Sequence, residues 1–386
     1  MSTARSAIRT ARSESAFLFG AVTTAVFYAL GATLVEDLGA NAKTAALFVW
    51  VFAAMLWCAF GVVRHADCLA ELLGEPYGTL ILTLSVIIIE VSLIASIMLL
   101  GENEPALARD TMFAVLMIIL NGMVGIALLL GAIRHREQHY NLQGAKAFLA
   151  VIIPLSALTL ILPNFTTSTP GPTFTFVQGA FFGTSTIVLY AVFLLIQTAR
   201  HRRHFMQPGE RTHPPMPHRD PLAHEEGGRE PGHHEVRSVG YHAVFLFLTI
   251  LPVVLLSKKL AAFVDFLTET MGAPAALGGL VIAVLVLSPE GLSSLQAALR
   301  NRLQRSVNIL LGSALATIGL TVPAILTIGL ITGKRVELGL EPVEMLMLIL
   351  TLAVCSLTFS GGRTSVLQGA VHVVLFLAYI VLIFNP

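Results

Sequence analysis

The sequence predicts an all-α integral membrane protein with about 11 transmembrane helices. Of its 386 residues 55% are hydrophobic and only 12% are charged, whereas soluble domains carry about twice that charged share. Stretches of about 20 apolar residues recur along the chain, which is the length that spans a bilayer as a helix. The predicted spans lie near residues 15–35, 44–63, 77–100, 111–133, 147–163, 174–198, 241–257, 273–299, 307–332, 343–358 and 365–384.

The first apolar stretch is expected to be a retained helix. Arg5, Arg9 and Arg12 precede it, and Ala40-Asn41-Ala42 has the small-x-small form of a signal-peptide cleavage site. The apolar run of 20 residues is, however, longer than the core of a typical signal peptide. Residues 1–43 are therefore expected to form an N-terminal segment with one extra transmembrane helix.

The distribution of Lys and Arg predicts the orientation. With the N-terminus in the cytoplasm and alternating helices, 18 of the 24 Lys and Arg fall on the cytoplasmic side. Positive residues favour that side of a bacterial membrane. The sequence thus predicts a multi-pass protein of the bacterial cytoplasmic membrane whose C-terminus lies outside. The net charge of +1 gives no indication of nucleic-acid binding, so the lipid bilayer is the expected surrounding.

Two apolar stretches resemble each other, and each contains a glutamate. The segment from Gly78 to Glu90 aligns without a gap with the segment from Gly278 to Glu290. Gln178 and Gln368, each followed by Gly-Ala, form a second match in the same order. The chain therefore contains two five-helix units, expected at residues 44–198 and 241–386. Because five is odd, the two units would be inverted relative to each other, which is the usual architecture of secondary transporters.

A hydrophilic linker, residues 199–240, separates the two units. Its six prolines, several glycines and mixed charges cannot bury a core, so we expect a largely disordered cytoplasmic connector. A role as a metal sensor is the alternative, because the linker holds seven histidines. Their irregular spacing defines no ligand geometry. They are His201, His204, His213, His218, His224, His233 and His234.

The three cysteines, Cys58, Cys68 and Cys355, have no metal-binding or redox spacing. An odd number of widely separated cysteines argues against a disulfide framework, so they are expected to pack in the interior.

Glu90 and Glu290 are the candidate ion-binding residues. A charged side chain in the centre of a membrane helix costs roughly 2.5 kcal/mol or more, so it is usually functional. Hard cations such as Ca²⁺ require oxygen ligands, and burial favours the protonated form of a carboxyl group. Protons or a cation could therefore neutralise the pair alternately. That chemistry predicts exchange of Ca²⁺, Na⁺ or K⁺ for protons by a carrier without a cofactor or an enzymatic activity.

Several polar residues are candidates for completing this site. Pro289 precedes Glu290 directly and is expected to break its helix and free backbone carbonyls. Ser293 and Ser294 follow Glu290 by three and four residues, on one helix face. The other candidate ligands are Thr83, Asn121, Gln178, Asn308, Ser313, Thr317, Gln368 and His372, for which ordinary contacts between helices are the alternative.

Five titratable residues, in contrast, fall between the predicted spans. A solvated amphipathic face is the expected reading for them, and attraction of cations toward the site is the alternative. They are His65, Asp67, Glu71, Asp265 and Glu269.

The chain resembles bacterial members of the cation/proton exchanger group in the Ca²⁺/cation antiporter superfamily, and most closely the ChaA type of calcium (sodium, potassium)/proton antiporter. Outside the linker, the resemblance runs from about residue 15 to the end. The segments that carry it are Gly74 to Ser92, Leu287 to Gly291, Arg305 to Asn308, Gly362 to His372, and Gln197 to Phe205.

The resemblance implies one extra helix plus two inverted five-helix repeats, with essential carboxylates at Glu90 and Glu290. Two features depart from the family. Relatives often have an acidic linker, whereas residues 201–240 hold six acidic residues and six arginines. Many exchangers carry an Asn four residues before the repeat glutamate, where this chain has Val86 and Val286.

Two other functions are alternatives to this prediction. A membrane-bound di-iron oxygenase or desaturase could use His135, His139, His201, His204 and the pair at 233–234. That reading leaves the buried glutamates unexplained. A passive cation channel could use the two carboxylates as a selectivity site. The sequence leaves open which cation is preferred, how many protons return and how many chains assemble.

Overall fold

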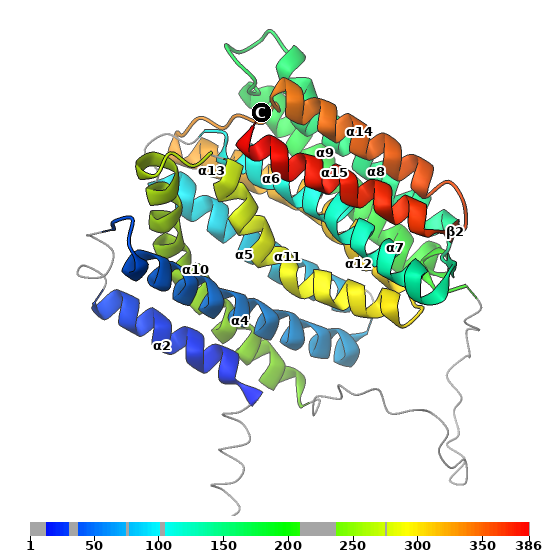
Figure 1. Cartoon of the computed structure of the whole chain (residues 1–386), viewed down its shortest axis with the longest axis horizontal. Helices are drawn as coiled ribbons and strands as arrows, with labels where there is room; N and C mark the ends of the chain where they lie inside the picture. The colour runs from blue at the N-terminus through cyan, green and yellow to red at the C-terminus, as the bar shows by residue number, and fades with distance from the viewer. Residues whose placement is uncertain are drawn as a thin grey trace, which may run out of the picture.

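The computed structural model describes residues 13–30, 38–74, 77–100, 105–208, 237–274 and 276–385, and these residues form a bundle of helices (Figure 1). Eight of the described helices are long and apolar enough to span a membrane. Three shorter apolar helices accompany them at Ser15–Ala29, Leu80–Ser96 and Pro342–Thr358. The all-α membrane class is thus confirmed, while the count of eleven crossings stays a prediction.

The first unit follows an N-terminal helix, α2 (Ser15–Ala29). Several transmembrane helices of the first unit are continuous but contain consecutive α, π and 3-10 segments. In chain order the elements are α4 (Ala42–Leu73), α5 (Tyr77–Leu100), α6 (Leu107–Met117), η1 (Ile118–Met123), α7 (Val124–His135), β1 (Gln138–His139), α8 (Leu142–Ser156), η2 (Ala157–Ile161), η3 (Leu162–Phe165), α9 (Phe176–Leu195), η4 (Ile196–Arg200) and η5 (Arg202–Phe205).

The second unit also contains five long helical segments, but its strand precedes the last of them, whereas β1 precedes the fourth helical segment of the first unit. Its elements are α10 (Val239–Asp265), η6 (Phe266–Thr270), α11 (Ala276–Leu299), α12 (Leu303–Ala316), η7 (Thr317–Thr321), α13 (Val322–Thr332), α14 (Pro342–Thr358), β2 (Arg363–Thr364) and α15 (Val366–Phe384). The short strands β1 and β2 pair antiparallel, with Gln138 opposite Thr364, and so join the two units at one end of the bundle.

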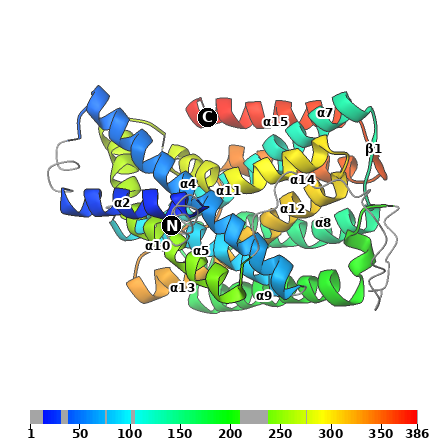
Figure 2. The same ribbon diagram turned by 90° about the horizontal axis from the view of Figure 1, so that it is seen from below.

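Three groups of helices lie side by side. Helices α2, α4 and α10 pack together along one edge, and α8, α9, α14 and α15 lie on the other side with α7 (Figures 1 and 2). Between them, α5 and α11 pack against α4, α6 and α12. The glutamate-bearing helices α5 and α11 therefore lie between the two other groups, although each keeps an exposed apolar face, with Ile88 on α5 and Leu292 on α11.

Glycines allow the closest of these contacts. A Cβ at Gly279 on α11 would lie 2.8 Å from the backbone of Asp110 and Thr111 on α6. A Cβ at Gly369 on α15 would meet the backbone of Leu129 on α7 in the same way. Small residues permit such approach of transmembrane helices, where packing replaces the hydrophobic driving force.

The N-terminal helix α2 is attached to both long helices beside it. Glu14, at its start, accepts a hydrogen bond from Arg64 at 2.7 Å and contacts His65 Nε2 at 2.9 Å, both on α4. His65 Nδ1 in turn lies 3.0 Å from Nδ1 of His242 on α10. This buried polar cluster fixes the start of α2 against α4 and α10.

Two helices extend beyond the ends predicted from hydropathy. Helix α4 continues to Leu73 rather than ending near 63, and the helix that starts with α10 continues through η6 to Thr270 rather than ending near 257. Titratable side chains are compatible with a helix but lower its hydropathy, so the apolar window stops too early. Placing His65, Asp67, Glu71, Asp265 and Glu269 between the helices was therefore wrong.

The cysteines lie where the sequence predicted. Cys58, Cys68 and Cys355 are all buried and none forms a disulfide. The linker prediction falls largely outside the described residues, which end at 208 and resume at 237.

Candidate ion-binding site

Glu90 lies at the centre of the bundle and is 1% exposed. Its Oε2 accepts a hydrogen bond of 3.0 Å from Thr317 Oγ1, which belongs to the second unit. Its Oε1 has no hydrogen-bond partner, and neither has the hydroxyl of Thr321, which faces the same carboxyl group. A buried carboxyl group with one free oxygen retains the capacity to bind a proton or a cation.

Glu290 lies beside a cavity of about 350 Å³. Its Oε2 is buried without a hydrogen-bond partner, and Ser313 of α12 lies next to its carboxyl group. The wall of the cavity comes from α4, α5, α9, α11 and α12 with η4 and η7, so helices of both units enclose it. Glu290 therefore faces a space that a cation and water can occupy.

The two carboxyl groups belong to one polar centre. Thr317 donates to Glu90 and also lines the cavity beside Glu290. The charge of Glu290 lies within electrostatic reach of Glu90. Among the described residues, no Lys or Arg nitrogen lies within 4.0 Å of either carboxyl group. A structural ion pair with a base therefore does not explain these two glutamates.

Segments of π-helix lie next to both glutamate-bearing helices. η7 (Thr317–Thr321) packs against α5, and η1 (Ile118–Met123) packs against α11. Asn121 and Thr321 are 200 residues apart, the same offset as Glu90 and Glu290. Single π turns inside α-helices occur frequently at functional sites, because the wider turn redirects side chains. The sequence did not predict these segments.

Pro289 does not break its helix, so that prediction was wrong. Helix α11 is continuous from Ala276 to Leu299 with the proline inside it. A proline removes one backbone amide and the hydrogen bond to the carbonyl four residues earlier. Close packing of α11 between α6, α12 and α4 keeps the rest of the helix in place, and neighbouring helices commonly make such prolines tolerable in membranes.

Five of the predicted accessory ligands line the cavity with Glu290, and Thr317 is one of them. Ser293 lies one turn after it on α11, and Thr83 lies two turns before Glu90 on α5. Ser313 and Asn308 come from α12. Both amide atoms of Asn308 are engaged, one with Gln304 and one with the carbonyl of Phe205, each at 2.7 Å. The hydroxyl groups are therefore better available to a cation than this amide.

Three other candidates do not line the cavity. Ser294 is buried and bonds Ser306 at 2.7 Å, because it points from α11 toward α12. Asn121 donates to Thr351 at 2.8 Å, and its Oδ1 lies 3.2 Å from His372 Nδ1. These contacts correspond to the alternative stated above, ordinary hydrogen bonding between helices.

Gln178 and Gln368 lie at the starts of helices rather than at the cavity. Gln178 forms a capping box with Thr175 at the start of α9, and Gln368 forms one with Ser365 at the start of α15. Such boxes satisfy amide groups that the first helical turn leaves free. The Gln-Gly-Ala match between the two halves thus reflects an equivalent helix start in each.

Sequence reasoning missed part of the cavity wall, namely Tyr190, Gln197 and Arg305. It offered Asp67 as a residue that could attract cations, but placed it between helices, and the structure places it on the cavity wall. Asp67 and Arg305 lay outside the apolar windows, so hydropathy gave no reason to place them near a membrane-embedded carboxyl group. The available signal was helical spacing, because Asp67 lies on the continuation of α4.

The histidines form no metal centre in the part of the chain described by the structure. No group of three or more His, Cys, Asp or Glu there could hold a metal ion. The rings of His201 and His204 stack on each other, and His135 Nε2 contacts the carbonyl of Leu299. Residues 233 and 234 lie outside the described residues.

Solved structures of similar fold are cation exchangers. The chain superposes on native YfkE with a TM-score of 0.71 and 15% identity, covering 96% of this chain and 100% of that one. The H⁺/Ca²⁺ exchanger CAX gives a TM-score of 0.61 at 14% identity, covering 96% and 88%. At these identities the likeness establishes the fold.

Sequence relatives extend the likeness. The chain is 37% identical to the sodium-potassium/proton antiporter ChaA of Escherichia coli (strain K12) over 387 residues, covering 100% of both chains. It is 43% identical to the y4hA protein of Sinorhizobium fredii over 327 residues, or 84% of each. The sodium/calcium exchanger protein family matches residues 43–199 and 241–385. Family and relatives are transporters, which does not favour the di-iron oxygenase. The chain belongs to the sodium/calcium exchanger protein family.

Proposed function

We propose that this protein exchanges cytoplasmic Ca²⁺, Na⁺ or K⁺ for external protons across the bacterial cytoplasmic membrane. Glu90 and Glu290 would be neutralised in turn by protons and by the transported cation. The observation that carries this proposal is the pair of buried carboxyl groups, each with an oxygen that lacks a hydrogen-bond partner. The ChaA relative is a sodium-potassium/proton antiporter, and two more distant relatives are Ca²⁺/H⁺ antiporters.

The charge balance of the centre favours exchange. Two ionised carboxylates in a medium of low dielectric constant repel each other and lose hydration, which costs several kcal/mol or more per ion. Two protons, one divalent cation or two monovalent cations restore neutrality equally well. Only a neutralised centre would move between the two sides, so outward cation movement would require inward proton movement.

Hydroxyl groups and water would complete the coordination of the cation. Ca²⁺ takes 6–8 oxygen ligands, which two carboxylates cannot supply alone. Thr317 lies at Glu90, and Thr83, Ser293 and Ser313 line the cavity on the side of Glu290. The cavity also has room for water, which would allow one site to accept cations of different size and charge.

The arrangement of charges supports an orientation in which the cavity opens toward the cytoplasm. Gln197 and Arg305 both line the cavity. Gln197 is followed closely by the arginines at 200, 202 and 203, and Arg305 is preceded by those at 300 and 302. These Arg-rich segments carry the excess of positive charge that marks the cytoplasmic side. We therefore propose that the cavity opens toward the cytoplasm. The two five-helix units would then cross the membrane in opposite orientations.

Proton release from everted membrane vesicles tests the proposal. Respiration acidifies the vesicle lumen, and Ca²⁺, Na⁺ and K⁺ are then added separately at several pH values. Exchange predicts proton release that saturates with cation concentration and requires both glutamates. Cation flux without proton release would instead support a passive channel, and the absence of any response in wild-type vesicles would refute the proposal.

A further inference from the structure

Asp67 is an acidic side chain on the wall of the cavity. It lies near the end of α4 between two buried residues, Ala66 and Cys68, and is itself exposed. It lines the cavity together with Glu290 and Ser293 and lies within electrostatic reach of Glu290. Its side chain therefore borders the same space as the candidate ion-binding glutamate.

Arg305 carries the opposing charge on the same wall. It belongs to the first turn of α12, in the second unit, and is also exposed. Its charge acts on Asp67, yet among the described residues the two side chains form no ion pair within 4.0 Å. Among the residues that the structure describes, Asp67, Glu290 and Arg305 are the charged side chains that line the cavity. The charge of Asp67 is thus opposed by Arg305 but not paired with it.

We propose that Asp67 captures the transported cation at the mouth of the cavity and thereby sets the apparent affinity on that side, while Arg305 limits the attraction. The inference rests on the proposed exchange function. A carboxylate between walls of low dielectric constant raises the local concentration of cations beside Glu290. Arg305 keeps that attraction moderate, so that a captured ion can continue to the centre or leave.

The valence of the cation gives this proposal a quantitative signature. The energy of a cation in the field of Asp67 is proportional to its charge, so it is twice as large for Ca²⁺ as for Na⁺ at the same place. Asp67→Asn should then raise the KM for Na⁺ by about 3-fold and that for Ca²⁺ by about 10-fold, the square of the first factor. Maximal rates should change by less than about 2-fold, because the glutamates are intact.

Kinetics in everted vesicles test the inference, because these vesicles expose the cytoplasmic face. Initial rates of proton release are measured against Ca²⁺ and Na⁺ for wild type, Asp67→Asn, Asp67→Glu, Arg305→Gln and the double variant Asp67→Asn/Arg305→Gln. Asp67→Glu should behave like wild type. Arg305→Gln should lower both KM values with the same dependence on valence, and the double variant should lie near wild type.

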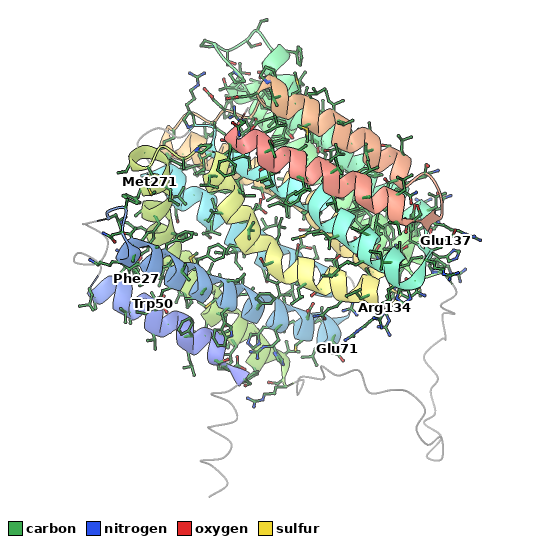
Figure 3. The ribbon with its side chains drawn as sticks, in the orientation of Figure 1. Phe27, Trp50, Glu71, Arg134, Glu137 and Met271 are labelled. Atoms are coloured by element: carbon green, nitrogen blue, oxygen red, sulfur yellow. The ribbon has the colours of Figure 1, made fainter. Side chains whose placement is uncertain are left out.

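Glu71 provides a matched control on the same helix. It lies one turn beyond Asp67 and is exposed, but it does not line the cavity. Figure 3 shows it at the end of α4 away from Trp50. Glu71→Gln removes the same charge from the same end of the bundle, so it should change both KM values by less than about 2-fold. A shift as large as that of Asp67→Asn would indicate a general surface potential and overturn the inference.

Ionic strength and sidedness complete the test. Raising the salt from about 0.02 M to about 0.3 M with choline chloride should reduce the effect of Asp67→Asn, because salt screens exposed charges. In right-side-out vesicles the external KM should not change. Equal KM shifts for Na⁺ and Ca²⁺, unchanged KM values, or a loss of maximal rate at constant KM would each overturn the inference. Failure of wild-type exchange would instead refute the proposed function.

Discussion

The surroundings of Glu90 and Glu290 differ, although the two residues occupy matching places in the sequence. Glu90 is enclosed, and Thr317 donates to it directly. Glu290 borders a cavity that also contains Asp67 and Arg305 at its wall. In this structure Glu90 thus belongs to the enclosed half of the candidate site, and Glu290 belongs to the open half that borders the cavity.

The largest effect expected from this comparison is that both glutamates are indispensable despite their unequal surroundings. Glu90→Gln and Glu290→Gln keep the shape of the side chain but remove the ability to trade a proton for a cation. Each should lower the initial exchange rate by at least about 100-fold in everted vesicles, because the centre can no longer be neutralised in two ways.

Membrane abundance and a surface control make this result interpretable. Glu137 forms an exposed ion pair with Arg363 at the end of the bundle where Glu71 and Arg134 also lie (Figure 3). Glu137→Gln should therefore leave exchange near wild type, since exposed pairs contribute little. Wild-type exchange by either glutamate variant, at normal abundance in the membrane, would show that the two carboxyl groups are not the coupling site.

Much of this architecture was accessible from the sequence, because a bilayer imposes strong constraints. Long apolar runs predicted the helices, and Glu90 and Glu290 stood out because charge is costly among such runs. The duplicated segments predicted which helices are equivalent. In the structure Gln178 and Gln368 form capping boxes at the start of the last long helix of each unit, whereas β1 and β2 follow different helices.

What the sequence could not predict depends on local backbone geometry and on packing between units. Hydropathy identifies apolar cores but not helix ends, so Asp67 was placed outside α4. The rule that proline breaks helices predicted a gap at Pro289, but neighbouring helices hold α11 together. Ser293 and Ser294 appeared equivalent by spacing, yet only Ser293 lines the cavity, since Ser294 meets Ser306.

The enclosed half should be sensitive to the loss of a single hydroxyl group. Thr317→Val removes the hydrogen-bond donor of Glu90 without changing the size of the side chain. Hydrogen bonds to charged groups contribute about 1.5–3 kcal/mol, which corresponds to about 10-fold or more in apparent cation affinity. The KM for Ca²⁺ in everted vesicles measures it, and Ser294→Ala serves as a control for removing a buried hydroxyl group elsewhere. Equal effects of both would contradict a specific role of Thr317.

The open half should tolerate the equivalent change better. Ser313→Ala removes the hydroxyl group beside Glu290, but water in the cavity can replace it at little cost. We expect the KM for Ca²⁺ to rise by only about 2–3-fold. A Ser313→Ala effect as large as that of Thr317→Val would mean that the two carboxyl groups are equally enclosed during cation binding, and the contrast between them would then have no functional meaning.

The smallest effect is expected where the two halves are alike. Gln178→Ala and Gln368→Ala each remove one side of a capping box, at Thr175 and at Ser365, and neither residue lines the cavity. Each change should cost about 0.5–1 kcal/mol of helix stability, which lowers the unfolding temperature in detergent by about 1–3 °C. The KM for Ca²⁺ should stay unchanged in both variants, because each glutamine satisfies a helix start rather than an ion. If one of the two raised the KM while its counterpart did not, the duplicated glutamines would have diverged into different roles, as the two glutamates have diverged in their surroundings.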